Sequence, residues 1–313
     1  MGEIMSVIGL GYCCVDFISL VPRIPNIDES VRILESTKQG GGVVATAIVT
    51  LARLGAKTFF LGCVGDDDHG QFVISDLKNE GVNISNMVIV PSLRTSFSYI
   101  LIDKSTGKRT IAYYYDPSLL EHLAKIDMEL IKEADILHID GAYEASIKAV
   151  KIAKKAGVTV SCDAADYAPE YYKILKFIDI FIPSIDMARF LTGKKDPIEA
   201  AKNLLRAGPS IVGVTLGDQG SICVTKDKVI RKPAFKVNVV DTTGAGDVYH
   251  GAFIFGLLQE WPLDVVVEFS NAVSAIKCEK LGGRAGIPSL SQVETFLRNY
   301  GIKLPPVKSL VRN

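Results

Sequence analysis

The chain lacks an excess of charge of either sign, because 35 Lys and Arg residues balance 35 Asp and Glu residues among its 313 residues. A neutral chain gives no overall electrostatic argument for binding nucleic acid or an anionic membrane, so we predict neither partner. The six cysteines form no C-x-x-C pair. This argues against a zinc site and a secreted disulfide framework, and it favours a reducing cytoplasm.

Long uninterrupted apolar runs are also missing. The apolar stretch over residues 4–22 contains Asp16 and follows Glu3 rather than basic residues, so we expect neither a signal peptide nor a membrane span. A Walker phosphate loop is absent as well. The Gly-Lys pairs that begin at Gly107 and Gly193 are not followed by Ser or Thr and have no glycine five residues upstream. A nucleotide would have to be held in another way.

Short runs typical of β-strands alternate with helical patterns along the chain. This rhythm predicts an α/β fold with a mostly parallel sheet flanked by helices. Because 48% of the residues are hydrophobic, the chain can bury one large core, and we expect a single domain over residues 1–313. The runs are Met5–Leu10, Val43–Leu54, Thr58–Gly62, Gln71–Asn79, Ile136–Ile139, Ser146–Ala156 and Val158–Cys162.

Two stretches break this rhythm, because they hold strand-like runs with no helical pattern between them. The runs are Phe17–Val21, Val31–Glu35, Phe97–Ile102 and Thr110–Tyr115. They predict a small separate β-sheet built from about residues 13–39 and 93–116.

The segment Asp241–Asp247 reads Asp-Thr-Thr-Gly-Ala-Gly-Asp and opens an apolar helical run, Val248–Leu258. Small residues let backbone N–H groups close around an anion, and the positive end of the helix dipole adds attraction. These residues are Gly244, Ala245 and Gly246. Asp247 lies in the first turn, where an ionised carboxylate can accept a hydroxyl proton. The segment therefore predicts a site that neutralises phosphate and accepts a proton, as a kinase requires.

The same segment resembles the C-terminal signature of the PfkB family of carbohydrate kinases, which have the ribokinase-like fold. Further motifs similar to this family follow its expected order over nearly the whole chain. They are Gly40–Gly42, Gly62–Gly70, Thr215–Gly220 and Gly282–Pro288. The residues of these motifs look most similar to those of the branch that contains ketohexose and sulfofructose kinases. The resemblance implies an ATP-dependent kinase that uses Mg²⁺, phosphorylates a primary hydroxyl of a small sugar, and folds its small sheet over the sugar as a lid.

The resemblance also implies the sugar contacts. Asp16 would bind sugar hydroxyls through its two carboxylate oxygens, whereas Asp16 without the resemblance reads as a turn or edge aspartate. Gly41 and Gly42 would let the backbone approach the sugar closely. Thr46 stands where many members of the family carry an asparagine, so ribose specificity does not transfer directly.

On the nucleotide side, Thr215 and Gly217 would line the phosphates, Gly220 would allow the turn, and Asn271 would belong to the adenine pocket. The chain departs from the family nearby, where Ser184 replaces an asparagine and the only carboxylate is Asp186. Asp186 either orders water around Mg²⁺ or caps the following helix. In related kinases two loops supply carbonyl oxygens to a monovalent cation, which suggests K⁺ here. The matching residues are Asp241, Thr243 and Gly286.

The substrate is predicted to be an unsubstituted furanose-forming sugar, fructose-like first and ribose-like second. An anionic sugar would need a cation, for which Arg32 is the first candidate, with Arg94 and Arg109 behind it. However, Tyr113–Tyr115 and Gly141 fall where the sulfosugar branch is expected to show Asn and Arg. Because tyrosines also stack on nucleobases, a nucleoside kinase is the alternative. A sugar-binding regulator without catalysis is the alternative from another class, and the presence of Asp247 beside an unbroken glycine loop argues against it.

Related kinases often dimerise through their lids, so the resemblance favours a homodimer. The apolar residues of the predicted small sheet alternate as if one face pointed at sugar and the other at a partner subunit. They are Phe17, Val31, Ile33, Phe97, Tyr99 and Leu101. The alternative is a monomer in which this apolar face rests on the main domain.

Overall fold

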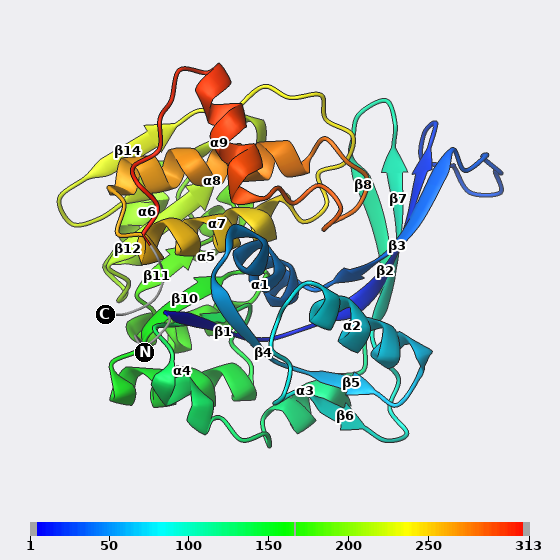
Figure 1. Ribbon diagram of the computed structural model, residues 1–313, viewed down its shortest axis with the longest axis horizontal. Coiled ribbons are helices and arrows are strands. Elements are labelled where there is room, and N and C mark those ends of the chain that lie inside the picture. Colours follow the sequence, from blue (N-terminus) through cyan, green and yellow to red (C-terminus); the bar gives the residue numbers. More distant parts are fainter. Residues whose placement is uncertain (1–4, 166, 309–313) are drawn as a thin grey trace.

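The computed structural model describes residues 5–165 and 167–308. Figure 1 shows a central sheet between two layers of helices, with a small sheet standing to one side. The strand order of the central sheet is β14-β13-β12-β11-β10-β9-β1-β4, and all pairs are parallel except β12 with β13 and β13 with β14. Its strands are β1 (Ser6–Leu10), β4 (Lys57–Leu61), β9 (Ile136–Ile139), β10 (Thr159–Asp163), β11 (Ile180–Ile182), β12 (Ile211–Thr215), β13 (Ser221–Val224) and β14 (Val229–Lys232).

The helices cover both faces of the central sheet, because alternate strand residues point to opposite sides. Val7 of β1 belongs to one buried cluster with residues of α1, α2, α7, α8 and α9, whereas Ile8 belongs to a second cluster with residues of α3, α4, α5 and α6. The helices are α1 (Val43–Leu54), α2 (Asp68–Asn79), α3 (Pro117–Leu123), α4 (Glu144–Ala156), α5 (Ile185–Thr192), α6 (Pro197–Leu205), α7 (Ala245–Leu258), α8 (Leu263–Lys277) and α9 (Leu290–Asn299). Within the described ranges, none of them is long and apolar enough to cross a membrane.

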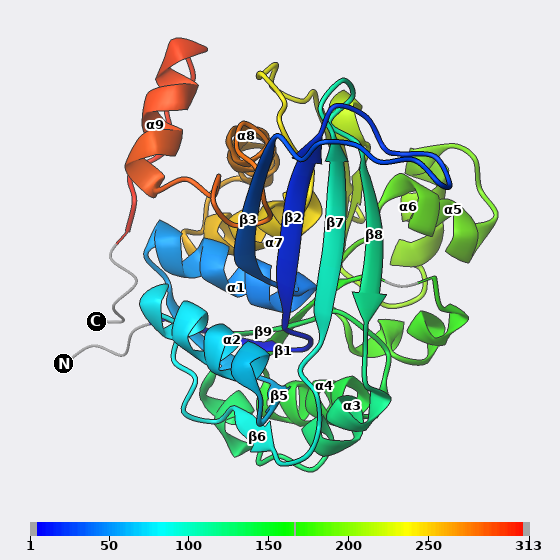
Figure 2. The same ribbon diagram turned by 90° about the vertical axis from the view of Figure 1, so that its right-hand side faces the viewer.

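The small sheet has the strand order β3-β2-β7-β8. Its strands are β2 (Cys14–Val21), β3 (Glu35–Gly41), β7 (Phe97–Asp103) and β8 (Arg109–Tyr114). Ile18 and Ile100 are buried on its inner face against Leu281 of the main body. Figure 2 shows the outer face from the front, with α2 near one end and no helix over the rest. A further pair of short strands, β5 (Cys63–Gly65) and β6 (Val88–Val90), lies below it.

The predicted α/β class is confirmed, and most of the predicted runs match observed elements within one residue. One predicted strand is wrong: Val31–Glu35 is not a strand, and β3 instead begins at Glu35 and runs to Gly41. The pairing explains the difference, because Leu20 lies opposite Glu35 and Cys14 lies opposite Gly41, which places Val31 and Ile33 beyond the ladder. This edge strand is polar, so the search for apolar alternation missed it.

Helix α7 is held tightly against α1, and this contact positions the start of α7. Gly251 makes the close approach possible: a Cβ at this position would lie 2.5 Å from the carbonyl oxygen of Ala47 and 2.7 Å from Cβ of Thr50. Any side chain at Gly251 would push the two helices apart. The N-terminus of α7 is therefore fixed from within the core.

Candidate active site

The parallel strands end along one edge of the central sheet, and the small sheet stands beyond that edge (Figure 1). Only three residues separate the end of β1 at Leu10 from the start of β2 at Cys14. In open α/β sheets, ligands bind outside the carboxyl ends of the strands. The predicted site residues belong to the main body and to the small sheet, and the two parts meet where Arg109 of β8 contacts Thr242 of the loop before α7.

The predicted anion loop begins α7 without a side-chain cap. Gly244 is the N-cap residue, with φ of 74°, and a Cβ there would lie 3.0 Å from the Gly283 carbonyl oxygen. The N–H of Ala245 donates to the Thr242 carbonyl at 3.2 Å. Above Gly246 the space is open, since no atom lies within 4 Å of a built Cβ. An anion can therefore approach the first turn of α7 from the side of Gly246.

Buried Asp241 fastens the start of this loop. One carboxylate oxygen accepts the N–H of Thr243 at 2.8 Å, and the other accepts the N–H of Gly282 at 2.8 Å. The main-chain carbonyl of Asp241 accepts a hydrogen bond from Nζ of Lys277 at 3.0 Å. The loop at residues 241–244 and the loop that begins at Gly282 are thus joined through a single residue, which keeps both in a fixed relation.

Asp247 lies on the first turn of α7 and is half-buried. Burial raises the pKa of its carboxyl group to about 7; the positive charge of Arg109 opposes the rise and the negative charge of Asp16 adds to it. Asp16 and Arg109 both belong to the small sheet, and Arg109 reaches the main body at Thr242, five residues before Asp247. A carboxylate with a pKa near neutrality is suited to accept a proton and to release it again.

On the sugar side, Asp16 is buried on the inner face of β2, paired with Ser98 of β7 and Gln39 of β3. Burial raises the pKa of the Asp16 carboxyl, whereas the hydrogen bond from Cys14 opposes the rise. A Cβ at Gly41 would lie 2.2 Å from an oxygen of Asp16. Glycine is therefore required at this position so that the carboxylate stays open to a ligand.

Gly42 is the N-cap residue of α1 and has φ of 98°, and a Cβ there would lie 2.3 Å from the Tyr12 carbonyl oxygen. Thr46, one turn into α1, is 2% exposed, and its hydroxyl accepts a hydrogen bond from Arg284 Nε at 3.3 Å. The Thr46 side chain is thus tied to a protein partner, which differs from the sugar contact predicted for this position.

Arg284 joins the small sheet to the helices of the main body, although the sequence motif assigned it no role. The guanidinium is buried and donates to the Gly41 carbonyl at 2.9 Å and to Asp76 of α2 at 2.5 Å. The N–H of Arg284 donates to the side chain of Gln39 at 3.0 Å. These bonds hold the end of β3, and with it the neighbourhood of Asp16, against the main body.

Of the three arginines named as candidate cations, Arg109 rather than Arg32 contacts the loop before α7. Arg32 is exposed and lies past the end of β2 opposite to Asp16, because Leu20 pairs with Glu35 at that end. Arg109 of β8 instead reaches the loop before α7 and donates to the Thr242 hydroxyl at 3.3 Å. Arg94 lies over the rings of Phe97 and Tyr114. Among the three candidates, only Arg109 is shown to interact electrostatically with Asp247.

The predicted phosphate contacts come together at the ends of β11 and β12. Ser184 and Thr215 form an isolated bridge, and the Thr215 N–H donates to the carbonyl of Pro183 at 3.1 Å. Gly217 and Gly220 have positive φ angles of 61° and 89°, and a Cβ at Gly220 would lie 2.1 Å from the Lys232 carbonyl oxygen. These glycines lie in the turn that joins β12 and β13 as an antiparallel hairpin.

Two other candidates on this side already have protein partners. Asn271 of α8 is buried; its carbonyl accepts from Ser221 at 2.9 Å and its amide donates to the Lys232 and Pro233 carbonyls at 3.2 Å. Asp186 is exposed and pairs with Arg189 at 3.5 Å. The helix cap that was the alternative for Asp186 is formed instead by Ser184, which accepts the Met187 N–H at 3.2 Å.

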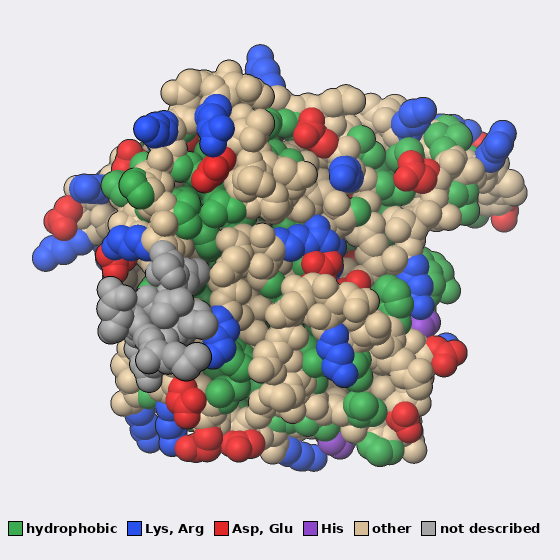
Figure 3. Space-filling view, viewed as in Figure 1, with side chains coloured by type: hydrophobic (Ala, Val, Ile, Leu, Met, Phe, Trp, Pro, Cys, Tyr) green, Lys and Arg blue, Asp and Glu red, His purple; other side chains and the backbone are tan. Residues whose placement is uncertain are grey.

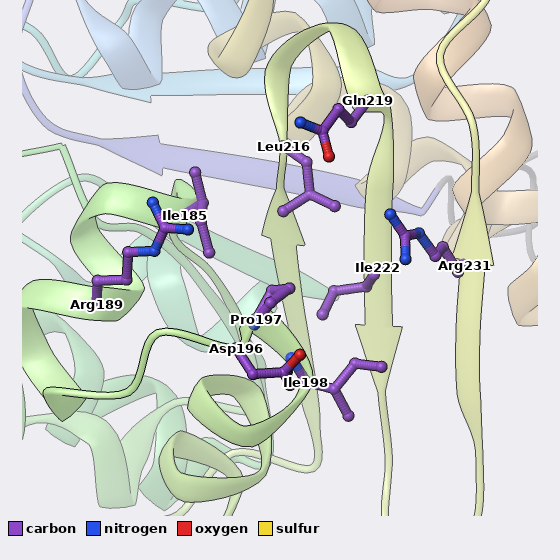
Figure 4. Close-up of a pocket in the computed structure, with 9 residues that line it drawn as sticks. All are labelled: Ile185, Arg189, Asp196, Pro197, Ile198, Leu216, Gln219, Ile222 and Arg231. Atoms are coloured by element: carbon purple, nitrogen blue, oxygen red, sulfur yellow. Dashed lines mark hydrogen bonds between the residues drawn. The ribbon is translucent and has the colours of Figure 1, made fainter.

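A small cavity of ≈ 270 Å³ lies behind the turn at residues 217–219. Figure 4 shows Ile185 and Arg189 on α5, Leu216 and Gln219 at the turn, and Arg231 on β14 around it. This volume is below the usual range of about 300–1,000 Å³ for small-molecule sites. None of the residues of the anion loop or of the small sheet lines it, so we interpret the cavity as a packing feature beside the hairpin.

Sequence reasoning missed three charged residues of the site. Asp140 follows β9, is 5% exposed, and accepts hydrogen bonds from the Tyr143 hydroxyl at 2.8 Å and the Tyr12 N–H at 3.2 Å. A carboxylate directly after a buried strand at this edge was a usable signal. For Lys277 and Arg284 the signal in the sequence was weaker. Both are buried against residues distant in the sequence, and a local pattern does not reveal such contacts.

The comparisons with known proteins agree with this geometry. The pfkB family carbohydrate kinase pattern matches residues 5–290. The chain is 29% identical over 321 residues to fructokinase-1 of Oryza sativa subsp. japonica, covering 93% of this chain and 97% of that protein. It is 30% identical over 301 residues to the ribokinase of Staphylococcus aureus (strain COL), covering 92% and 98%. An E. coli protein described as a ribokinase II, solved with ATP and Mg²⁺, superposes with a TM-score of 0.84 at 24% identity, covering 95% and 100%.

The protein is a phosphotransferase with an alcohol group as acceptor. The chain belongs to the pfkB family of carbohydrate kinases, and its fold is the ribokinase-like α/β fold. The resemblance inferred from the motifs is thereby confirmed.

The charge of Arg109 makes a testable contribution to the titration of Asp247. Because Arg109 favours the ionised carboxylate, Arg109→Gln is expected to raise the pKa of Asp247 further above its value of about 7, by about one pH unit. The measurement is a carbon-13 NMR titration of the labelled aspartate carboxyls, with Asp247→Asn identifying the signal. The neighbouring exposed Lys108, changed to Gln, is the matched control. Equal midpoints in the wild type and in Arg109→Gln would contradict the assignment.

Proposed function

We propose that this carbohydrate kinase transfers the γ-phosphoryl group of MgATP to the primary hydroxyl of a small neutral sugar, with a fructose-like ketohexose preferred and a ribose-like sugar second. The observation that carries the proposal is the first turn of α7, where Gly244 is the N-cap without a side-chain hydrogen bond, the space over Gly246 is open, and Asp247 follows with a pKa raised by burial. The carboxylate of Asp247 is suited to accept a proton, and that of Asp16 on the small sheet is suited to accept hydroxyl hydrogen bonds.

In this mechanism, Asp16 orients the sugar and Asp247 accepts the proton of the attacking hydroxyl. The first turn of α7 beside Gly244, Ala245 and Gly246 faces the charge that spreads over the transferring phosphoryl group. The buried hydroxyl of Thr243 has no hydrogen-bond partner within the described ranges, so it is available as a further donor. MgATP is the second substrate, and its metal ion neutralises phosphate charge while it keeps mostly phosphate and water oxygens as ligands.

The nucleotide is proposed to lie along Ser184, Thr215, Gly217 and Gly220, where α5 and the β12–β13 hairpin begin at the same edge. The glycine turns allow the backbone to approach phosphate closely. Asp186 would contact Mg²⁺ through water, after release from its exposed pair with Arg189. The relatives named as fructokinase and ribokinase, and the E. coli structure solved with ATP and Mg²⁺, support MgATP as the second substrate.

The charged residues around the proposed sugar site support a neutral acceptor. Two buried carboxylates, Asp16 and Asp140, line the sugar side, and Arg284 nearby is bound to protein groups. Arg109 interacts with Asp247 and Thr242, on the phosphoryl side. Tyr113 lies on the inner face of β8 opposite Ser98 and is 75% exposed, so it can stack on a ring. This residue keeps a nucleoside kinase as the second candidate.

A phosphoryl-transfer screen tests the proposed substrate class. Purified protein is incubated with MgATP and a panel of ketoses, aldoses, sugar acids and nucleosides, and ADP formation and the product are both measured. We expect the highest kcat/KM with fructose or a related ketohexose. A nucleoside as the best acceptor would favour the second candidate. An anionic sugar as the best acceptor would contradict the neutral-sugar proposal, and a protein that binds sugar without turnover would be a regulator.

Two substitutions separate the roles of the carboxylates. Asp247→Asn is expected to lower kcat by about a hundredfold with little change in sugar binding, because an amide cannot accept the proton. Asp16→Ala is the matched variant, and it is expected to raise the sugar KM by an amount equal to about 1.5–3 kcal/mol of lost charge-assisted hydrogen bonding. Steady-state kinetics with saturating MgATP measures both. Near-full turnover in Asp247→Asn would remove this residue as the base.

We also propose that the small sheet is a lid and that two lids pack together in a homodimer in the cytoplasm. The outer face of the small sheet carries Tyr99, which is 58% exposed, and no helix covers this part of the face (Figure 2). An exposed aromatic on an uncovered sheet face favours a partner. All six cysteines are free and buried, which supports a reducing compartment. Figure 3 shows acidic and basic side chains intermixed on one face of the molecule, which gives no support there for nucleic acid as a partner.

Light scattering tests the dimer. At micromolar protein we expect the mass of a dimer with and without sugar, and Tyr99→Arg is expected to yield monomers because it places a charge in the contact. Val229→Arg, on the exposed β14 at the other side of the molecule, is the matched control and should leave the mass unchanged. A monomer mass for the wild type in both conditions would leave the lid as a flap that closes on its own site.

A further inference from the structure

Lys277, the last residue of α8, is fully buried, at 0% exposure. Lysine is almost never buried unless it is paired. The Lys277 ammonium donates a hydrogen bond to the main-chain carbonyl of Asp241 at 3.0 Å. Both carboxylate oxygens of Asp241 meanwhile accept main-chain N–H groups, from Thr243 and Gly282. The ammonium therefore lies beneath the loop that opens α7, at a carbonyl that a cation would be expected to bind.

The charge of Lys277 acts on the same groups as the proposed catalytic site. Burial lowers the pKa of Lys277, whereas the negative charge of Asp241 opposes that effect. Lys277 in turn favours the ionised form of Asp247. A positive charge at this place supports the carboxylate of Asp247 and adds to the attraction of the α7 N-terminus for phosphate.

The residues predicted to bind K⁺ do not fit a separate monovalent cation. K⁺ at these loops would have to share the carbonyl oxygen of Asp241 with the Lys277 ammonium, which donates to that oxygen at 3.0 Å. A second positive charge beside a buried ammonium would be strongly repelled. Gly286, another predicted ligand, packs so closely on α8 that a Cβ there would lie 2.1 Å from the Lys277 carbonyl oxygen. The position of the predicted cation is thus filled from within the chain.

We propose that Lys277 is a positioning residue whose ammonium takes the place of a bound monovalent cation, so that this kinase works without K⁺. Through the Asp241 carbonyl, the ammonium holds the four residues from Asp241 to Gly244 and so fixes the first turn of α7. The inference rests on the proposed role of that turn as the anion hole. It does not depend on which sugar is the acceptor.

The wild-type enzyme gives the first test. With the best acceptor of the screen, turnover is measured in tetramethylammonium salts and with K⁺ replacing them at constant ionic strength. We expect kcat to stay within about twofold, below the range typical of coupling between a ligand and a site. We also expect the same Tm in both salts, and the measurement of Tm needs no substrate. Strong activation by K⁺, or a Tm that rises with K⁺, would overturn the proposal.

Substitution gives the second test. Lys277→Ala is expected to lower kcat by about a hundredfold in the absence of K⁺, because the turn that binds the phosphoryl group loses its support. K⁺, NH₄⁺ or methylammonium should restore part of the loss and raise the Tm of the variant, whereas tetramethylammonium is too large to do so. Lys277→Met has a side chain of similar length but no charge, and it leaves no space for a small cation. Its kcat should therefore fall, and added cations should not restore it.

The matched control is Lys280→Ala, three residues further on, where the side chain is exposed. It should behave as the wild type in every salt. Full activity of Lys277→Ala without added cation would overturn the proposal, as would a loss that none of the small cations restores. If the variants do not fold, the wild-type comparison of K⁺ and tetramethylammonium still decides. If no acceptor is turned over, that result would contradict only the proposed function. The role of Lys277 would still be tested by comparing the Tm in K⁺ and in tetramethylammonium salts.

Discussion

The structure depends on the buried guanidinium of Arg284, which joins the small sheet to the main body. Asp16 belongs to β2 of the small sheet and Asp247 to α7 of the main body, so their relative position is only as fixed as the joint between these two parts. Arg284 donates to the Gly41 carbonyl, to Thr46 and to Asp76, and each of these partners comes from a different element. Breaking a buried charge pair by removing one partner typically costs about 3–5 kcal/mol. That penalty favours a single arrangement of the two sheets.

The joint also explains where glycine is required. Gly41 carries the carbonyl that Arg284 binds, and its missing side chain leaves the carboxylate of Asp16 open. Gly42 turns the chain into α1 beneath it with a positive φ. Two adjacent glycines thus satisfy two different constraints, one set by the ligand side of the sheet and one by the backbone. The glycine run in the sequence predicts that other groups come close to the backbone there, but it does not show which groups these are.

Local patterns in the sequence predicted the central sheet, α1, α7 and the loop at Asp241–Asp247, because periodicity and small-residue spacing act over a few residues. The roles of Arg284 and Lys277 could not be predicted in this way. Arg284 meets Gly41 across 243 residues and Lys277 meets Asp241 across 36. In a helical pattern, a lysine at the end of α8 reads as an ordinary solvated last-turn residue. The strand β3 was misplaced for a related reason, since its register is set by β2 rather than by its own composition.

The charges around Asp247 link the position of the small sheet to proton transfer. Burial disfavours the carboxylate of Asp247, while Arg109 and Lys277 favour it. Lys277 is fixed in the core, but Arg109 is carried by β8 and touches the main body at Thr242. A small sheet that swings away would withdraw Arg109 and take Asp16 with it, so the sugar ligand and one of the two cations leave together. In the proposed mechanism, Asp247 is therefore best ionised in the same arrangement in which Asp16 would hold the sugar and water would be excluded. Coupling these events through one rigid sheet would lower the chance that ATP is hydrolysed when no sugar is in place.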